Sequence, residues 1–196
     1  MGKRDKLSEF YDEYIENFKD KIVVTGIGNI DAKLLLIGEA PGKDEIKKNE
    51  PFVGAAGKNL NIFLDSIGVK REDIFITNSI KYRLSKPSSL TGRLVNTPAK
   101  RIDIEMNREY LIREIGIISP EIIVTLGNVP LKSVTGDFKL NIGDVHGKAL
   151  NIKMVMFGGD EQGIKLFPLY HPASIIYNRS LQDVYQEDVM RLKEVL

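Results

Sequence analysis

Residues 35–57, LLIGEAPGKDEIKKNEPFVGAAG, gather the side chains best suited to chemistry. An apolar run ends at Gly38, and a polar, glycine-rich segment follows it. This segment holds two carboxylates, Glu39 and Glu45, and a single aromatic ring, Phe52. A strand, a polar loop and then a helix are how open α/β sheets present chemistry at the carboxyl ends of their strands. The stretch therefore predicts a pocket with carboxylates around one ring.

Two further polar side chains follow strand-like apolar runs. Asn78 ends IFITN, and its amide is both donor and acceptor, so it can pair with a carbonyl beside an N–H group, although a turn-capping role is the alternative. His171 follows KLFPLY and precedes Pro172, which fixes the backbone there. A lone histidine is more often structural, but this position favours a site. The other histidine, His146, stands in a turn and is interpreted as structural.

The elements that must position these residues alternate between strand and helix. Hydrophobic periodicity predicts strands at 33–37, 74–78, 121–126, 153–157 and 165–169, and helices at 5–19, 58–67, 98–117, 127–134 and 180–196. Residues 22–28 are either a short strand or an extended lead-in. Such alternation predicts an α/β fold, a three-layer α/β/α sandwich with a mainly parallel four- to five-stranded sheet. Because parallel strands end at one edge, Glu39, Asn78 and His171 are expected to lie close together.

Residues 82–97 interrupt this pattern. They carry Ser, Pro, Thr and Gly without periodicity, and we expect a long loop, which compact domains seldom keep without a functional reason. Thr97 and Pro98 are predicted to cap and begin the next helix.

Composition limits the classes of function. The 196 residues are 42% hydrophobic and 28% charged, which is typical of a single globular domain spanning residues 1–196. No apolar run approaches the ~20 residues of a membrane span, and the first residues lack the apolar core of a signal peptide, so a cytoplasmic location and no membrane partner are expected. Cysteine is absent, which excludes thiolate metal sites and cysteine nucleophiles, and no metal site is predicted. The Gly-Lys pairs lack the Ser or Thr of a nucleotide-binding P-loop.

Charge is segregated although the net formal charge is only +1. No Asp or Glu stands between residues 74 and 102, whereas six cations do: Lys81, Arg83, Lys86, Arg93, Lys100 and Arg101. A solvated loop normally mixes both signs, so this segment favours a polyanionic partner.

These segments together resemble the uracil-DNA glycosylase superfamily, and most closely its family 4 enzymes. Three stretches match the family's motifs in order: GEAPG with PFVGAAG (38–57), ITNSIKYR (76–83) and LYHPASII (169–176). Between them, ISPEIIVTLGNVP (118–130) is similar to the family's helix, strand and Leu-Gly turn. The resemblance covers roughly residues 20–195.

The resemblance implies a base excision repair enzyme that flips uracil from DNA and hydrolyses its N-glycosidic bond, with no lyase step. Phe52 would stack on the base, and Asn78 would pair with its O4 and N3–H edge. The main chain around Ala40 would add contacts to the base. His171 would donate to O2, where negative charge grows as the base departs. Glu39 would orient the attacking water and offset the positive charge of the sugar.

The resemblance also implies roles for a second carboxylate and for residues that contact DNA. Glu45 is a second candidate near the base or the water. Uracil-containing DNA, single- or double-stranded, would be the partner of a monomeric enzyme. Residues 171–179 would approach the minor groove, with a wedge from Ile175, Ile176 or Tyr177 and a phosphate contact from Arg179. Four cations of the acid-free segment would contact phosphates: Lys81, Arg83, Lys86 and Arg93.

Departures from the family are equally specific. Family 4 enzymes hold a [4Fe–4S] cluster on four cysteines, and this chain has none, so no cofactor is expected. Tyr82 stands where the family has one cysteine, and another falls near Asn107. We expect packing of Tyr82 against the first helix to take the place of the cluster. Ala173 replaces the serine of the family's His-Pro-Ser segment.

Two alternatives stay open at this point. The same chemistry could act on another deaminated base, such as hypoxanthine or xanthine. The chain could also be a non-catalytic DNA-binding module on a glycosylase fold, although such a module has no need of a water-positioning carboxylate.

Overall fold

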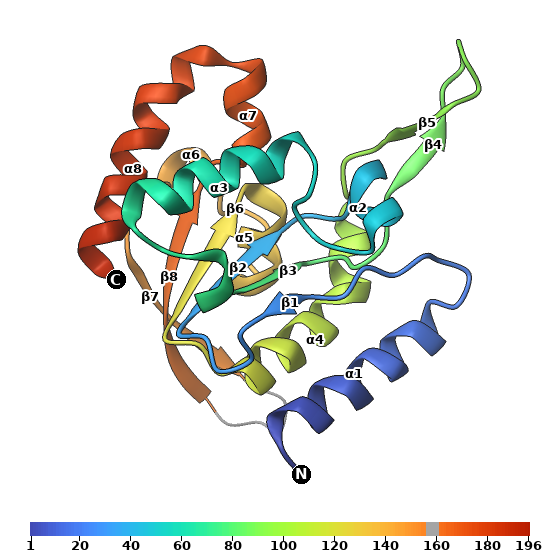
Figure 1. The fold of residues 1–196 in the computed structure, drawn as a ribbon, viewed down its shortest axis with the longest axis horizontal. Helices are drawn as coiled ribbons and strands as arrows, with labels where there is room; N and C mark the ends of the chain where they lie inside the picture. Colours follow the sequence, from blue (N-terminus) through green and yellow to red (C-terminus); the bar gives the residue numbers. More distant parts are fainter. Residues whose placement is uncertain (156–160) are drawn as a thin grey trace.

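The computed structural model describes residues 1–155 and 161–196. These form three layers, a central sheet with helices on each of its two faces (Figure 1). Within them the sheet has six strands in the order β1-β3-β2-β6-β8-β7. The strands are β1 (Ile27–Gly28), β2 (Leu34–Gly38), β3 (Phe75–Asn78), β6 (Ile122–Leu126), β7 (Leu150–Val155) and β8 (Glu161–Leu169). β3, β2, β6 and β8 are parallel, whereas β1 and β7 pair antiparallel at the two edges.

Helices cover both faces of the sheet because successive side chains of a strand point to opposite faces. Leu35 and Ile37 pack into a core with α1 (Lys3–Asn17), α4 (Arg101–Ile118), α5 (Asn128–Thr135) and α6 (Ile142–Val145). Leu36 packs on the other face, against α3 (Ala55–Ile67) and α8 (Gln182–Val195). The side chains of β2 are therefore buried on both faces of the sheet, which is why its apolar run is continuous.

The predicted three-layer, mainly parallel architecture is confirmed. The sheet is wider than the predicted four or five strands because both antiparallel edge strands join it. The prediction that Thr97 and Pro98 cap and begin the fourth helix is wrong, since α4 begins at Arg101. There the Asp103 carboxylate accepts the Lys100 N–H at 2.8 Å and satisfies a helix-terminal donor.

Residues 82–97 differ from the expected irregular loop. Strands β4 (Ser85–Pro87) and β5 (Leu94–Asn96) pair antiparallel and form a hairpin that projects from the body of the molecule (Figure 1). Three-residue strands are too short to show alternation in the sequence, which is why periodicity did not reveal them.

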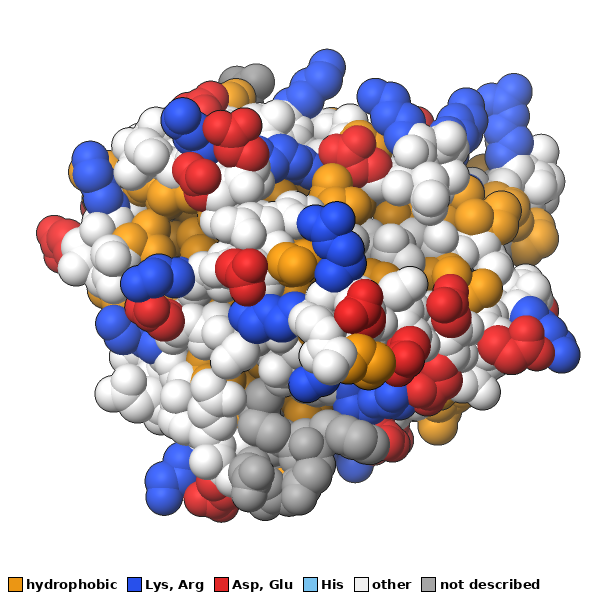
Figure 2. Space-filling view, turned by 60° about the horizontal axis from the view of Figure 1, so that its bottom comes forward, with side chains coloured by type: hydrophobic (Ala, Val, Ile, Leu, Met, Phe, Trp, Pro, Cys, Tyr) orange, Lys and Arg blue, Asp and Glu red, His pale blue; other side chains and the backbone are white. Residues whose placement is uncertain are grey.

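Short elements complete the part that the structure describes: α2 (Lys43–Lys48), α7 (Pro172–Tyr177) and the 3₁₀ turns Arg71–Asp73 and Arg179–Leu181. Every helix within it is too short or too polar to cross a bilayer. On the face turned forward in Figure 2, acidic and basic side chains are intermixed, unlike the acid-free hairpin segment. The carboxyl ends of β2, β3 and β8 lie at one edge of the sheet and lead into the loops that carry Glu39, Asn78 and His171.

Candidate active site

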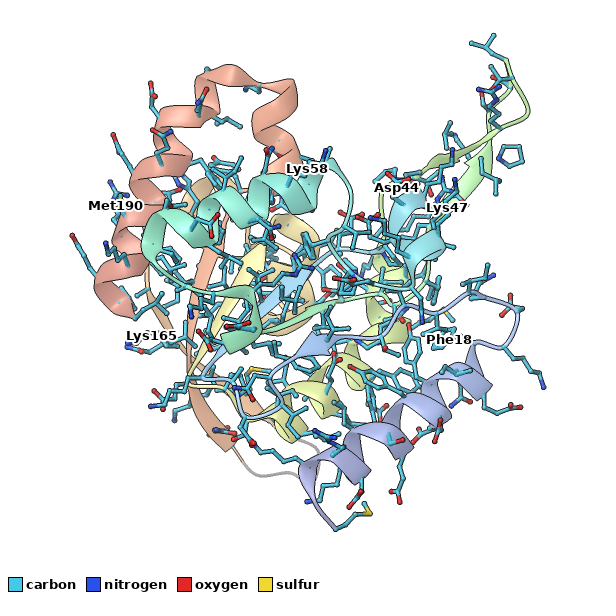
Figure 3. The ribbon with its side chains drawn as sticks, in the orientation of Figure 1. Phe18, Asp44, Lys47, Lys58, Lys165 and Met190 are labelled. Atoms are coloured by element: carbon cyan, nitrogen blue, oxygen red, sulfur yellow. The ribbon has the colours of Figure 1, made fainter. Side chains whose placement is uncertain are left out.

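A cavity of about 410 Å³ opens at this edge, in the size range of small-molecule sites. Its wall combines the loop after β2, the end of β3, the base of the hairpin and the start of α7. The lining residues are Ala40, Gly42, Lys43, Asp44, Glu45, Phe52, Gly54, Ala55, Ala56, Asn78, Asn96, His171 and Ala173. Figure 3 labels Asp44 on α2, beside the base of the hairpin. The three residues predicted to hold a base, Ala40, Phe52 and Asn78, thus share one cavity with His171.

Another groove, of about 390 Å³, runs between α3 and α8, where Figure 3 labels Met190. It has no carboxylate, histidine, lysine or arginine among its lining residues, and it lies away from the strand ends. This groove therefore offers no side chain that titrates near neutral pH.

Asn78 is the most informative wall residue. It is the last residue of β3, paired in register with Gly38 of β2, and the residue is only 4% exposed. A buried amide normally finds hydrogen-bond partners. The residues described here offer it none, and the amide faces the cavity. Its donor and acceptor are consequently available to a ligand.

Gly38 lets the Asn78 amide and the Phe52 ring lie close together. A Cβ atom at position 38 would stand 2.4 Å from the Asn78 Oδ1 and 2.5 Å from the Phe52 ring. Real Cβ atoms do not approach other atoms so closely, and both neighbours would have to move. The end of the β2 run at Gly38 is therefore a requirement of the site and not only a strand terminus.

Phe52 is held in a conformation that an aromatic residue rarely adopts, with φ at 56°. Two contacts fix it. The Arg71 guanidinium donates to the Phe52 carbonyl at 3.3 Å and to the Pro51 carbonyl at 2.6 Å. The Phe52 carbonyl also approaches Gly57 so closely that a Cβ there would lie 1.8 Å from it. The glycine and the arginine together hold the ring as a fixed platform.

His171 presents a defined tautomer to the cavity. Its Nδ1 accepts the Ala173 N–H at 3.1 Å, which leaves the proton of the neutral ring on Nε2. Burial lowers the pKa of His171 to about 4, so the ring is uncharged at neutral pH. The His171 and Phe52 rings are nearly parallel, with their centroids 6.2 Å apart. The ring is therefore a neutral hydrogen-bond donor toward the cavity.

This state of His171 is measurable by nitrogen-detected NMR of the two histidines. Between pH 7 and pH 5 we expect one imidazole to keep the shifts of a neutral Nε2–H ring. The His171→Ala variant assigns that signal by its loss, with His146 as the internal reference. A His171 signal that titrates near the ordinary value of 6.5 would contradict the burial that the structure shows.

Glu39 stands directly after Gly38 and beside Ala40. Its Oε1 accepts the Ala99 N–H at 3.0 Å, the one donor to this carboxylate among the described residues. Burial raises the pKa of Glu39 above its usual range. One carboxylate oxygen is thus fixed by the backbone where the hairpin returns to the body, and Oε2 has no partner among the same residues.

Glu45 lines the cavity, but both of its oxygens bind the main chain. Oε2 accepts the Gly42 N–H at 3.1 Å and Oε1 accepts the Gly54 N–H at 3.0 Å. The carboxylate therefore joins the two ends of the loop that carries Phe52. A direct role of Glu45 toward a base or a water stays a prediction.

The cations predicted to contact DNA fall into three groups. Lys86 and Arg93 are exposed on the hairpin. Arg83 is half-buried, and its guanidinium donates to the Asn96 Oδ1 at 2.7 Å and to the Leu94 carbonyl at 3.1 Å. The predicted phosphate contact of Lys81 is wrong, because its side chain is fully buried and pairs with Glu114.

The predicted wedge and its phosphate contact lie outside what the structure describes. These are the side chains of Ile175, Ile176, Tyr177 and Arg179.

A buried polar network lies directly behind Asn78. The Lys81 Nζ lies 2.7 Å from the Glu114 Oε2, and it donates to the Asn78 carbonyl at 3.1 Å. Thr77 Oγ1 lies 3.1 Å from both Glu114 oxygens, and the Tyr11 hydroxyl donates to the same carboxylate. The ammonium group therefore ties the end of β3 to α4.

The residues present do not fit an iron–sulfur cluster, because the sequence has no cysteine to ligate it. The positions where the resemblance places two of the cysteines carry Tyr82 and Asn107, and the Asn107 amide donates to the Tyr82 hydroxyl at 3.2 Å. The Tyr14 hydroxyl donates to the Asn107 Oδ1 and accepts the Lys81 N–H at 3.1 Å. Phe18 packs against Tyr82, their ring centroids 5.1 Å apart. The expected packing of Tyr82 against the first helix is confirmed, and hydrogen bonds reinforce it.

Two residues that contribute to the site were not predicted from the sequence. Asn96 lines the cavity from the hairpin, and Arg71 fixes the Phe52 loop from the turn after α3. Asn96 had a signal, since Asn96-Thr97-Pro98 resembles the Asn-Arg-x-Pro of the family. Arg71 had none, because nothing local links a cation to carbonyl groups 19 and 20 positions earlier.

Known proteins are similar to this chain over most of its length. The family described as the uracil DNA glycosylase superfamily matches residues 25–193. The chain is similar to the type-4 uracil-DNA glycosylase of Archaeoglobus fulgidus, with 36% identity over 175 residues, 88% of this chain and 81% of that protein. The Sulfurisphaera tokodaii enzyme of the same name is 36% identical over 97% of this chain and 85% of its own length. The Saccharolobus solfataricus enzyme of the same name is 37% identical over 90% of this chain and 77% of its own length. The range matched by the family, residues 25–193, includes the ends of β2, β3 and β8 that meet the cavity.

Proposed function

Because this chain belongs to the uracil-DNA glycosylase superfamily, we propose that its cavity receives a uracil flipped out of DNA. The protein is a uracil-DNA glycosylase, a hydrolase of N-glycosyl bonds, and DNA is its substrate. Extrusion is required because the glycosidic bond of a stacked base is out of reach of a buried pocket. We expect the protein to be monomeric and to act in the cytoplasm.

The observation that carries the base assignment is the unpaired, buried amide of Asn78. Uracil presents a carbonyl, O4, next to the N3–H group, which an amide matches with its own donor and acceptor. Cytosine presents the opposite pattern, and each buried group left unpaired against it costs about 1–3 kcal/mol. Phe52 supplies a flat platform beneath the ring.

His171 stabilises the departing base in this proposal. Its Nε2–H donates to O2 of uracil, where negative charge accumulates as the glycosidic bond breaks. A neutral donor suits this task because it keeps its proton throughout, and the lowered pKa of His171 keeps the ring neutral at neutral pH. The nearby Ala40 N–H adds a backbone contact to the base.

Glu39 acts on the sugar side of the bond. One oxygen is held by the Ala99 N–H, and the other accepts a proton of the attacking water. The negative charge also offsets the oxocarbenium character of the sugar. Hydrolysis then delivers the hydroxyl to C1′ of the sugar, and the base leaves as an anion that takes up a proton. Glu45 holds the loop that carries Phe52 and acts as a positioning residue.

The assay is cleavage of a uracil-containing oligonucleotide, incubated with the protein and then treated with alkali. Strand scission at uracil, in single- or double-stranded substrate, is the expected result. Parallel substrates with hypoxanthine or xanthine measure the range of bases accepted. Absence of scission at uracil in both strand states and at every salt concentration would overturn the proposal.

Gly38→Ala tests the geometry of the cavity. The added methyl displaces the Asn78 amide or the Phe52 ring, and a misplacement of about 1 Å lowers kcat/KM on the order of 10²-fold. Gly163→Ala in β8 is the matched control, since a Cβ there meets nothing within 4 Å. Wild-type kcat/KM in Gly38→Ala would contradict the contact between these three residues.

A further inference from the structure

The hairpin is a preorganised arm. Pairs Lys86–Val95 and Pro87–Leu94 set its register, and the Ser88 N–H donates to the Arg93 carbonyl at 2.8 Å. The turn closes at Gly92, whose N–H donates to the Ser88 carbonyl at 2.9 Å and whose φ of +66° suits glycine. The apex is therefore fixed by hydrogen bonds even though it stands away from the body (Figure 1).

The apex exposes apolar side chains. Leu90 is 92% exposed, the highest fraction among the large hydrophobic residues that the structure describes, and Leu94 is 56% exposed. Single exposed leucines are common on protein surfaces. An apolar apex on a projecting, ordered hairpin is different, because it can be covered only by something outside the chain.

The charges of the arm indicate what covers it. Lys86 and Arg93 are exposed and form no ion pair with the described residues, and the whole segment 74–101 has no carboxylate. Lys86 pairs with Val95, and Arg93 stands two residues from Val95, so both cations project from the same face of the ribbon. An apolar tip beside a cationic, acid-free face complements DNA, whose phosphates flank an apolar stack.

The arm grows directly from the wall of the cavity. Asn96, the last residue of β5, lines the cavity, and the Ala99 N–H beyond it holds Glu39. Six residues separate Asn96 from Leu90, so at ~3.3 Å per residue the apex reaches at most about 20 Å from the cavity wall. This span corresponds to about six base-pair steps at ~3.4 Å each. A duplex that delivers a nucleotide to the cavity therefore passes within reach of the apex.

We infer that the β4–β5 hairpin is a duplex-binding arm, in which Leu90 contacts the base stack within about six base-pair steps of the flipped nucleotide and Lys86 and Arg93 pair with flanking phosphates. This inference rests on the proposed function of the cavity. An apolar side chain set against the stacked bases can favour bending of the duplex and flipping of a nucleotide only where a base stack exists. The arm consequently separates duplex from single-stranded substrate.

The test compares duplex and single-stranded uracil substrates for Leu90→Ala, with Ile62→Ala as a control because Ile62 is 68% exposed on α3, outside the cavity. Leu90→Ala should lower kcat/KM about 10-fold on the duplex and less than about twofold on the single strand. Ile62→Ala should change neither. Equal losses on both substrates, or no loss on the duplex, would overturn the inference.

A second readout needs no catalysis. Fluorescence anisotropy with a uracil-free duplex measures affinity against salt. Lys86→Gln with Arg93→Gln should reduce the slope of log K against log[salt] by about two, since each phosphate contact contributes ~0.9. An unchanged slope, or a loss of self-association on sizing instead of DNA affinity, shows that the arm serves another partner. Failure of the cavity proposal appears differently, as wild-type DNA binding without base release.

Discussion

Replacing Asn78 by alanine is expected to lower kcat/KM on a uracil oligonucleotide by about 10²- to 10³-fold. The amide supplies two buried hydrogen bonds to the base, each worth about 1–3 kcal/mol when its partner is left unpaired, and 1.36 kcal/mol corresponds to a factor of ten. DNA affinity should change less than about threefold, because phosphate contacts supply most of it. Gel-based cleavage under single-turnover conditions and anisotropy measure the two quantities.

Asn151→Ala is the matched control for this substitution, since Asn151 is exposed on the edge strand β7. It should preserve both the rate and the affinity. Thermal unfolding of both variants verifies the fold. Parallel losses of cleavage and of DNA binding in Asn78→Ala would mean that the amide supports the binding surface and does not read the base.

Lys81→Met is expected to lower the free energy of unfolding by about 3–5 kcal/mol. The substitution removes the ammonium group and leaves the Glu114 carboxylate buried without its counter-charge, which is the costly way to break a buried pair. It also removes the donor to the Asn78 carbonyl. Urea denaturation followed by circular dichroism at pH 7 measures the change.

Two variants make the Lys81 prediction specific. Lys33→Met breaks an ion pair whose side chains are 80% and 66% exposed, and it should cost less than about 1 kcal/mol. Lys81→Met combined with Glu114→Gln removes both charges while an amide still bonds Tyr11 and Thr77, so most of the stability should return. If Lys81→Met were as stable as Lys33→Met, the buried Glu114 carboxylate would have to be stabilised by something other than Lys81.

The strand ends that build the cavity were predictable from the sequence. An apolar run that stops at a glycine, an amide or a histidine marks the carboxyl edge of a buried parallel strand, and three such ends converge by topology alone. The layers and helices were predictable for the same reason, because hydrophobic periodicity is a local property.

Contacts distant in sequence were not predictable in this way. Counting cations placed Lys81 on the DNA surface, but its burial depends on Glu114, 33 residues away on α4. Glu45 was predicted to lie near the base or the water. Its contact with the Gly42 N–H is local, at the start of α2, but its contact with the Gly54 N–H nine positions later depends on how the loop closes. The hairpin needed cross-strand pairing to be recognised, and segments of three residues carry too little pattern for it.

The Tyr14–Asn107–Tyr82 junction has a consequence for how the protein matures and ages. Its side chains are phenols and an amide, and they contain no thiolate that an oxidant could convert to a sulfenic or sulfinic acid. The junction also forms as the chain folds, with no metal-loading step and no dependence on ligand deprotonation. Peroxide and chelators should therefore leave this part of the molecule folded.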